Sequence, residues 1–168
     1  MMRFLILLLV LCTISCKKEV EEKAYHYVEG ADIKMFDYNE LDSYIKNHPS
    51  ETLVVNFWAT WCAPCIKELP AFEKLGNTYA DQDVKILLVS LDFPEQMDHL
   101  KAFVAKKELQ SEVVFLDDGD ANRWIPKVDK NWSGALPATL IIGDKRKRFY
   151  EQSFTYGLLE SELKYILN

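Results

Sequence analysis

Four short apolar segments recur along the chain at spacings that suit a sheet with connecting helices. They cover residues 53–57, 84–89, 113–116 and 139–142. Within each segment the apolar residues follow one another almost without interruption, and such runs are typical of strands that are covered on both faces. The pattern therefore predicts an α/β fold with a central, buried sheet.

Segments with helical periodicity lie between and around these strands. One begins near Asp37, where Glu40 stands three residues later as in a capping box. Two others cover about 62–79 and 97–109, and an amphipathic helix closes the chain after about residue 159. Residues 148–152 alternate polar and aromatic side chains, which indicates a half-exposed edge strand.

The N-terminal part of the chain has a different pattern. Arg3 precedes an apolar stretch over 4–14, which is too short to span a bilayer as a mature helix and predicts a signal peptide over residues 1–15. Ser15 followed by Cys16 resembles the lipidation site of bacterial lipoproteins, in which the cysteine becomes the first residue and carries lipid. Thr13 departs from the leucine that this motif prefers, so ordinary signal cleavage stays open as an alternative.

The rest of the chain divides into a tether and one domain. Residues 16–30 are charged with little to bury, and residues 31–168 are long enough for a single domain that we expect to be monomeric. The formal net charge of −6 argues against a nucleic-acid partner. We interpret the basic cluster at 145–148 as solvated protection of a sheet edge.

A pair of cysteines follows the first predicted strand directly, in the sequence Trp61-Cys62-Ala63-Pro64-Cys65. On a helix, residues three apart share a face with Cβ atoms about 5–6 Å apart, which is close to what a disulfide needs. Cys62 is expected at the positive end of the helix, where a thiolate is stabilised, so we predict that it is the nucleophile. Cys65 lies one turn further and is predicted to be the resolving thiol.

A zinc site is the alternative reading of this spacing. The other cysteines are Cys12 and Cys16 in the N-terminal segment, and His26, His48 and His99 are not spaced as a ligand pair. After export and lipidation no further cysteine would remain in the domain, so the pair is expected to act chemically. We therefore expect no metal, and no cofactor besides the redox-active disulfide.

Three longer motifs extend the cysteine pair. They are Asn-Phe-Trp-Ala-Thr-Trp-Cys-Ala-Pro-Cys at 56–65, Glu-Leu-Pro at 68–70 and Gly-Ala-Leu-Pro-Ala-Thr at 134–139. Together they resemble the thioredoxin fold, and within it the membrane-anchored, extracytoplasmic thiol-disulfide oxidoreductases of the TlpA and ResA type. The resemblance implies a central mixed sheet with helices on both faces, and a strand-helix insertion within 92–131, before a cis-proline.

The resemblance also implies roles for residues around the pair. Pro137 would be the cis-proline that faces the disulfide, and the backbone of Leu136 would pair with an extended substrate segment. Trp61 and Trp132 would line the substrate groove. For both tryptophans, packing in the core is the alternative.

Glu68 corresponds to a glutamate that lies near the thiols in this family and modulates them. A carboxylate close to Cys65 would raise the pKa of that thiol and could take its proton. Thioredoxins have a buried aspartate where this chain has Asn56, which cannot titrate. Proton transfer would then depend on Glu68 or water, unless Glu68 faces solvent, which is the alternative.

The function that the resemblance implies is reduction of disulfides in exported client proteins, with cytochrome c maturation as the process most often associated with the family. Electrons would come from a membrane thiol transporter, and the protein would be held by its lipid on a bacterial membrane outside the cytoplasm, either on the periplasmic side or at the cell surface. The Ala-Pro dipeptide between the cysteines does not by itself set the direction of electron flow.

Two rival functions belong to other classes. A peroxidase of the peroxiredoxin type needs a threonine three residues and a proline seven residues before its reactive cysteine, where this chain has Ala59 and Val55. A binding lipoprotein could use a thioredoxin-like scaffold without redox chemistry, because a fold does not determine function.

Overall fold

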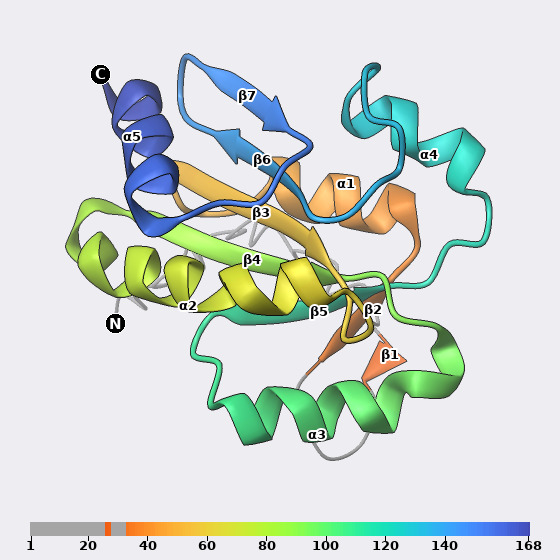
Figure 1. Ribbon diagram of the computed structural model, residues 1–168. Helices are drawn as coiled ribbons and strands as arrows, with labels where there is room; N and C mark the ends of the chain where they lie inside the picture. The colour runs from red at the N-terminus through yellow and green to blue at the C-terminus, as the bar shows by residue number, and fades with distance from the viewer. Residues whose placement is uncertain (1–25, 28–32) are drawn as a thin grey trace, which may run out of the picture.

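The structure is a computed structural model that describes residues 26–27 and 33–168 (Figure 1). The predicted signal peptide, Cys16 and most of the predicted tether lie outside the described residues. Within that tether, His26–Tyr27 forms a short strand, β1, that pairs antiparallel with the next strand. This part of the tether therefore belongs to the sheet.

The remaining elements follow in an alternating order. The strands are β2 (Lys34–Phe36), β3 (Thr52–Trp58), β4 (Val84–Ser90), β5 (Glu112–Leu116), β6 (Ala138–Ile142) and β7 (Lys147–Tyr150). The helices are α1 (Tyr38–Lys46), α2 (Ala63–Thr78), α3 (Met97–Lys107), α4 (Ala121–Val128) and α5 (Tyr156–Leu167), with short 3₁₀ helices η1 (Ala80–Gln82) and η2 (Pro94–Gln96). The four apolar segments coincide with β3, β4, β5 and β6, which confirms those predictions.

The strands form one mixed sheet in the order β1-β2-β5-β4-β3-β6-β7. Strands β2, β5, β4 and β3 run parallel, whereas β6 is antiparallel to β3 and β7 is antiparallel to β6. Parallel neighbours require crossover connections, which the helices supply. The predicted mixed sheet with helices on both faces is confirmed.

Both faces of the sheet are buried because apolar side chains point to each side of its strands. In β3, Val54 and Trp58 belong to the cluster beneath α2, α3 and α5, while Val55 and Phe57 belong to the cluster beneath α1 and α4. Figure 1 shows α2 and α5 in front of the sheet, with α1 and α4 behind it. Full burial on both faces explains the unbroken apolar runs in the sequence.

Local signals in the sequence set the helix ends. The Asp37 side chain accepts a hydrogen bond from the backbone N–H of Glu40, and the Glu40 carboxylate accepts one from the backbone N–H of Asp37, so the predicted capping box is present. In α2 the helix continues through Pro70. None of the described helices is long and apolar enough to cross a membrane.

The stretch 92–131 contains α3, β5 and α4, and β5 enters the sheet between β2 and β4. This arrangement matches the predicted strand-helix insertion before Pro137. The edge strand β7 includes Lys147 and Arg148, so half of the basic cluster at 145–148 lies in that strand. These cations follow the edge of the sheet, as edge protection requires.

Candidate active site

Loops from four parts of the chain meet at one edge of the sheet. Three of them follow the parallel strands β3, β4 and β5, and the fourth precedes the antiparallel strand β6. This is the end of the sheet formed by the carboxyl ends of its parallel strands, where residues distant in sequence become neighbours. They line an open groove of about 670 Å³ with parts of 61–64, 91–94, 116–125 and 134–136. We call it the Cys62 groove.

The cysteine pair lies where β3 passes into α2. Cys62 and Cys65 form a disulfide with their Cα atoms 5.3 Å apart. Cys62 is the N-cap of α2, and its sulfur accepts a hydrogen bond from the backbone N–H of Cys65 at 3.3 Å. Pro64 sits in the first turn, where the N–H that it lacks would have no intrahelical partner. The helix N-terminus thus directs a donor and its positive dipole end at the sulfur of Cys62.

The two sulfurs differ in their surroundings. Both cysteines belong to the core cluster beneath α2, but Cys62 is 5% exposed and lines the groove, whereas Cys65 is fully buried and does not. Groups of three or more histidine, cysteine or acidic side chains that could hold a metal ion do not occur in the described part of the chain. The geometry favours access to Cys62 first, with Cys65 behind it.

The loop before β6 forms the opposite wall of the groove. The bond between Leu136 and Pro137 is cis, as the resemblance implied. Pro137 is buried, and Leu136 lines the groove one residue before that proline. The register of β3 with β6 ends at the pair Phe57 and Ala138, so Leu136 lies beyond the paired part of the sheet.

The two predicted groove tryptophans have different positions. Trp61 is 53% exposed and lines the groove. Trp132 is buried instead, with its ring packed on Phe57 and Phe149 and its indole N–H donating to the carbonyl of Ala135. Its prediction as a groove residue is therefore corrected to its alternative, core packing. The second tryptophan that lines the groove is instead Trp124 of α4.

Glu68 lies one turn beyond Cys65 on α2 and is almost completely buried. Its carboxylate accepts hydrogen bonds from Asn56 Nδ2 at 2.9 Å and from the backbone N–H of Phe154 at 2.7 Å. Burial raises the pKa of Glu68 from 4.5 to about 7, against the lowering effect of these two hydrogen bonds. Glu68 thus does not face solvent, and on a helix it shares a face with Cys65.

Asn56 links this carboxylate to the start of β6, the strand that follows the cis-proline. Its Nδ2 also donates to Thr139 Oγ1 at 3.1 Å, one residue into β6. Its Oδ1 is buried and has no hydrogen-bond partner among the described residues. The amide therefore leaves one acceptor unused next to a titratable acid.

Asp92 is a buried acid that sequence reasoning missed. It follows β4, and its oxygens accept hydrogen bonds from the backbone N–H of Thr60 at 3.1 Å, from the Thr60 hydroxyl and from Ser90 Oγ at 2.7 Å. Thr60 directly precedes Trp61 and Cys62, so Asp92 ties the end of β4 to the turn that carries the reactive sulfur. An acid after an apolar strand is visible in the sequence, but its partner lies 32 residues earlier.

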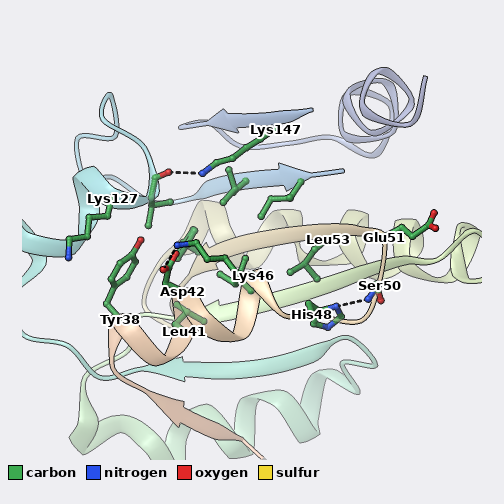
Figure 2. Close-up of a pocket in the computed structure, with 15 residues that line it drawn as sticks. Tyr38, Leu41, Asp42, Lys46, His48, Ser50, Glu51, Leu53, Lys127 and Lys147 are labelled. Atoms are coloured by element: carbon green, nitrogen blue, oxygen red, sulfur yellow. Dashed lines mark hydrogen bonds and ion pairs between the residues drawn. The ribbon is translucent and has the colours of Figure 1, made fainter. Parts of the chain in front are cut away.

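A second cavity of about 390 Å³ lies on the other face, among α1, α4 and strands β3, β6 and β7 (Figure 2). Its lining includes no cysteine and none of the predicted site residues. Lys46 Nζ pairs with Asp42 at 2.6 Å, and Lys147 Nζ donates to the carbonyl of Val128 at 3.3 Å. His48 Nδ1 accepts a backbone N–H at 3.3 Å. These polar groups are satisfied within the protein.

Comparison with known proteins places the chain in a family. Residues 16–147 match the AhpC/TSA family. The chain belongs to the AhpC/TSA family. Among its relatives, the thiol-disulfide oxidoreductase ResA of Bacillus thuringiensis (strain Al Hakam) is 32% identical over 126 residues, which are 73% of this chain and 67% of ResA. The resemblance to the ResA type is thereby confirmed.

Other curated relatives match over shorter parts. The chain spans from 28% to 57% of the length of several of them.

Solved structures support the fold of this AhpC/TSA family member. A thioredoxin-related protein from Neisseria meningitidis serogroup B aligns with a TM-score of 0.64 and 22% identity over 73% of this chain and 90% of that chain. StoA from Bacillus subtilis aligns with a TM-score of 0.53 and 19% identity over 82% and 92%. Both alignments cover most of the described domain, so the fold is that of thioredoxin.

Proposed function

We propose that this protein is an extracytoplasmic thiol-disulfide oxidoreductase that reduces disulfides in exported proteins. One observation carries the proposal. Cys62 caps α2 and lines an open groove, while Cys65, bonded to it, is fully buried behind it. A pair in which one cysteine borders a groove and the other lies behind it suits attack by the first and resolution by the second.

The reaction begins with both cysteines reduced. The Cys62 thiolate attacks one sulfur of a client disulfide, an S–S bond forms between Cys62 and the client, and the other client sulfur leaves as a thiolate that takes up a proton. The Cys65 thiolate then attacks the Cys62 sulfur, which expels the second client thiolate. Two electrons pass to the client, and the protein ends with the disulfide seen in the structure.

Glu68 supplies a path for the proton of Cys65. A carboxyl whose pKa is about 7 is present in both protonation states near neutral pH, so it can accept and return a proton. Once protonated, its O–H needs an acceptor in the core. The unpaired Oδ1 of Asn56 becomes that acceptor when the amide turns by half a rotation.

The loop before β6 receives the client. Leu136 lies next to the cis bond and outside the paired register of β6, in the wall of the groove opposite Cys62. Its backbone groups suit strand addition by an extended client segment, in which main-chain hydrogen bonds supply affinity. Trp61 covers the same segment from the cysteine side.

The proposal extends to the place of action and the partners of the protein. Lipidation of Cys16 after removal of residues 1–15 would hold the domain on the extracytoplasmic side of a bacterial membrane. A membrane thiol transporter would return the Cys62–Cys65 disulfide to dithiol after each cycle. Apocytochromes c are one class of client that needs reduced thiols.

Trapping of clients tests the proposal. Cys65→Ser removes the resolving thiol, so disulfides between Cys62 and clients should accumulate on gels run without reductant. Cys62→Ser is the matched control and should trap no client. Equal trapping by both variants would contradict the assigned roles of the two sulfurs. Mass spectrometry of the captured proteins would identify the clients.

The direction of electron flow has its own test. Equilibration of the Cys62–Cys65 pair with glutathione gives the reduction potential. A potential typical of reductants is expected, and one near that of strong oxidants such as DsbA would overturn reduction as the function. Consumption of hydrogen peroxide at a rate above that of disulfide reduction would instead support the peroxidase.

A further inference from the structure

Two large aromatic side chains stand exposed beside the reactive sulfur. Trp61 is 53% exposed and Phe93 is 60% exposed, and their rings stack with centroids 6.3 Å apart and planes 22° apart. Both line the Cys62 groove. Covering exposed apolar surface with a binding partner is energetically favourable, so this pair marks an interaction site. We call it the aromatic shelf.

The shelf joins two loops that the sequence keeps apart. Trp61 comes from the turn before α2, and Phe93 from the loop between β4 and η2. Asp92, next to Phe93, holds Thr60, next to Trp61, through its hydrogen bonds. The two rings are therefore set on a common buried anchor, which favours a preformed binding surface.

The charges in the groove restrict what can lie there. The described lining contains Asp92, Asp117 and Asp118 and no lysine, arginine or histidine. The carboxylate of Asp92 is occupied by Thr60, and that of Asp118 accepts the backbone N–H of Tyr38 and pairs with Arg123. Asp117 is exposed. These carboxylates would repel a ligand with acidic side chains, whereas a lysine or arginine of the ligand would pair with Asp117.

We infer that the Cys62 groove selects client segments by the side chain next to their cysteine. The preferred client is an extended polypeptide with a large apolar side chain beside its disulfide-bonded cysteine, seated on the aromatic shelf, and with a lysine or arginine that reaches Asp117. Phe93 is then the residue that sets specificity. The inference rests on the proposed function, because it deepens the choice of substrate at the same site.

Turnover of matched peptides tests the role of Phe93. Short synthetic peptides carry one cysteine as a mixed disulfide with glutathione, followed by either phenylalanine or serine. The wild type should reduce the phenylalanine peptide with a kcat/KM about tenfold higher than that for the serine peptide. One aromatic contact of this kind changes affinity by about tenfold. Phe93→Ala should bring the ratio to within about twofold, and Phe93→Tyr should preserve it.

Two controls separate client binding from damage to the fold. Reduction of hydroxyethyl disulfide, which is too small to cover the shelf, should fall by a smaller factor in Phe93→Ala than reduction of the phenylalanine peptide does. Tyr165→Ala removes an aromatic ring of α5 that is 52% exposed and outside the groove lining, and it should leave the peptide ratio unchanged. If Phe93→Ala slows all disulfides equally, or if the wild type shows no preference, the inference is wrong.

A binding arm keeps this inference distinct from the proposed activity. Peptides with serine in place of cysteine cannot react, yet they should shift the indole N–H resonance of Trp61 in the wild type and not in Phe93→Ala. A lysine peptide should bind more tightly than its glutamate counterpart, and Asp117→Asn should reduce that difference. Binding without turnover would contradict only the proposed function, and turnover without this selective binding would contradict only the inference.

Discussion

The Cys62 groove and the cavity of Figure 2 are both open, both partly apolar and both bordered by charged side chains, but they differ in how those groups are used. In the cavity, Lys46 pairs with Asp42, and Lys147 donates to a carbonyl of α4. In the groove, a sulfur held by a helix N-terminus stands beside Trp61 and Phe93, which remain exposed.

This difference indicates where chemistry is available. A polar group that is satisfied within the protein has little to gain from a ligand, because binding would exchange one partner for another. A reactive sulfur and uncovered aromatic rings gain most when a second molecule arrives. The groove is also the larger of the two, at about 670 Å³ against about 390 Å³, but its volume does not supply the reactive group.

The largest effect is expected from Cys62→Ser. Loss of the attacking sulfur should reduce insulin-disulfide reduction by more than about a thousandfold, as removal of a nucleophile does in other enzymes. Lys147→Ala, in the cavity of Figure 2, is the control and should leave the rate unchanged. If the Cys62→Ser variant still reduced insulin disulfides at a rate close to that of the wild type, the comparison would have assigned the chemistry to the wrong sulfur.

The second largest effect concerns Glu68 and pH. The pKa of Glu68 is raised from 4.5 to about 7 in the folded protein, so the folded state binds the proton more tightly than the unfolded state. The resulting contribution to the free energy of unfolding is fully present below about pH 4.5 and is lost as the pH rises through about 7. At about 1.4 kcal/mol per pH unit, it amounts to ~3 kcal/mol.

Denaturant unfolding across this pH range measures that contribution. The Glu68→Gln variant has no titratable group at this position. The free energy of unfolding of the wild type minus that of the variant should therefore decrease steadily from acid to neutral pH. Glu51→Gln, at an exposed position before β3, is the control for general effects of charge removal. A difference that stays constant with pH would show that the burial of Glu68 does not couple its proton to folding.

Asp92 supplies the third prediction, because it anchors the turn beneath the groove. Asp92→Asn should weaken the hydrogen bonds from Thr60 and Ser90 and leave a buried donor poorly paired, which costs about 1–3 kcal/mol of the free energy of unfolding. Thermal or denaturant unfolding measures this cost, with the exposed Asp81→Asn of η1 as control. An Asp92→Asn variant as stable as wild type would remove the proposed anchor of the aromatic shelf.

The sequence predicted the parts of the fold that local patterns determine. The apolar runs that form β3 to β6 are short but almost unbroken, and the helix that carries Cys62 follows its strand at once. Strands β1 and β2 were missed because two or three residues give no periodicity to detect. Helix α4 was missed because Pro126 lies inside it and interrupts a short pattern.

The candidate site shows the same limit at the level of single residues. Spacing placed Cys62 and Cys65 correctly, but the burial of Glu68 depends on the backbone of Phe154, which lies 86 residues away. Phe93 would be expected in the core from its residue type, and only the fold leaves it exposed beside Trp61. Contacts between distant segments thus decided what the local pattern could not.

The smallest effect is expected from Lys46→Ala, which removes a charged side chain from the lining of the cavity of Figure 2. The pair of Lys46 with Asp42 is an exposed i,i+4 ion pair on α1, and such pairs contribute less than about 0.5 kcal/mol. Stability should therefore change by no more than that, and disulfide reduction should not change. A variant that loses turnover while remaining folded would mean that this cavity is coupled to the groove, and the contrast between the two regions would no longer hold.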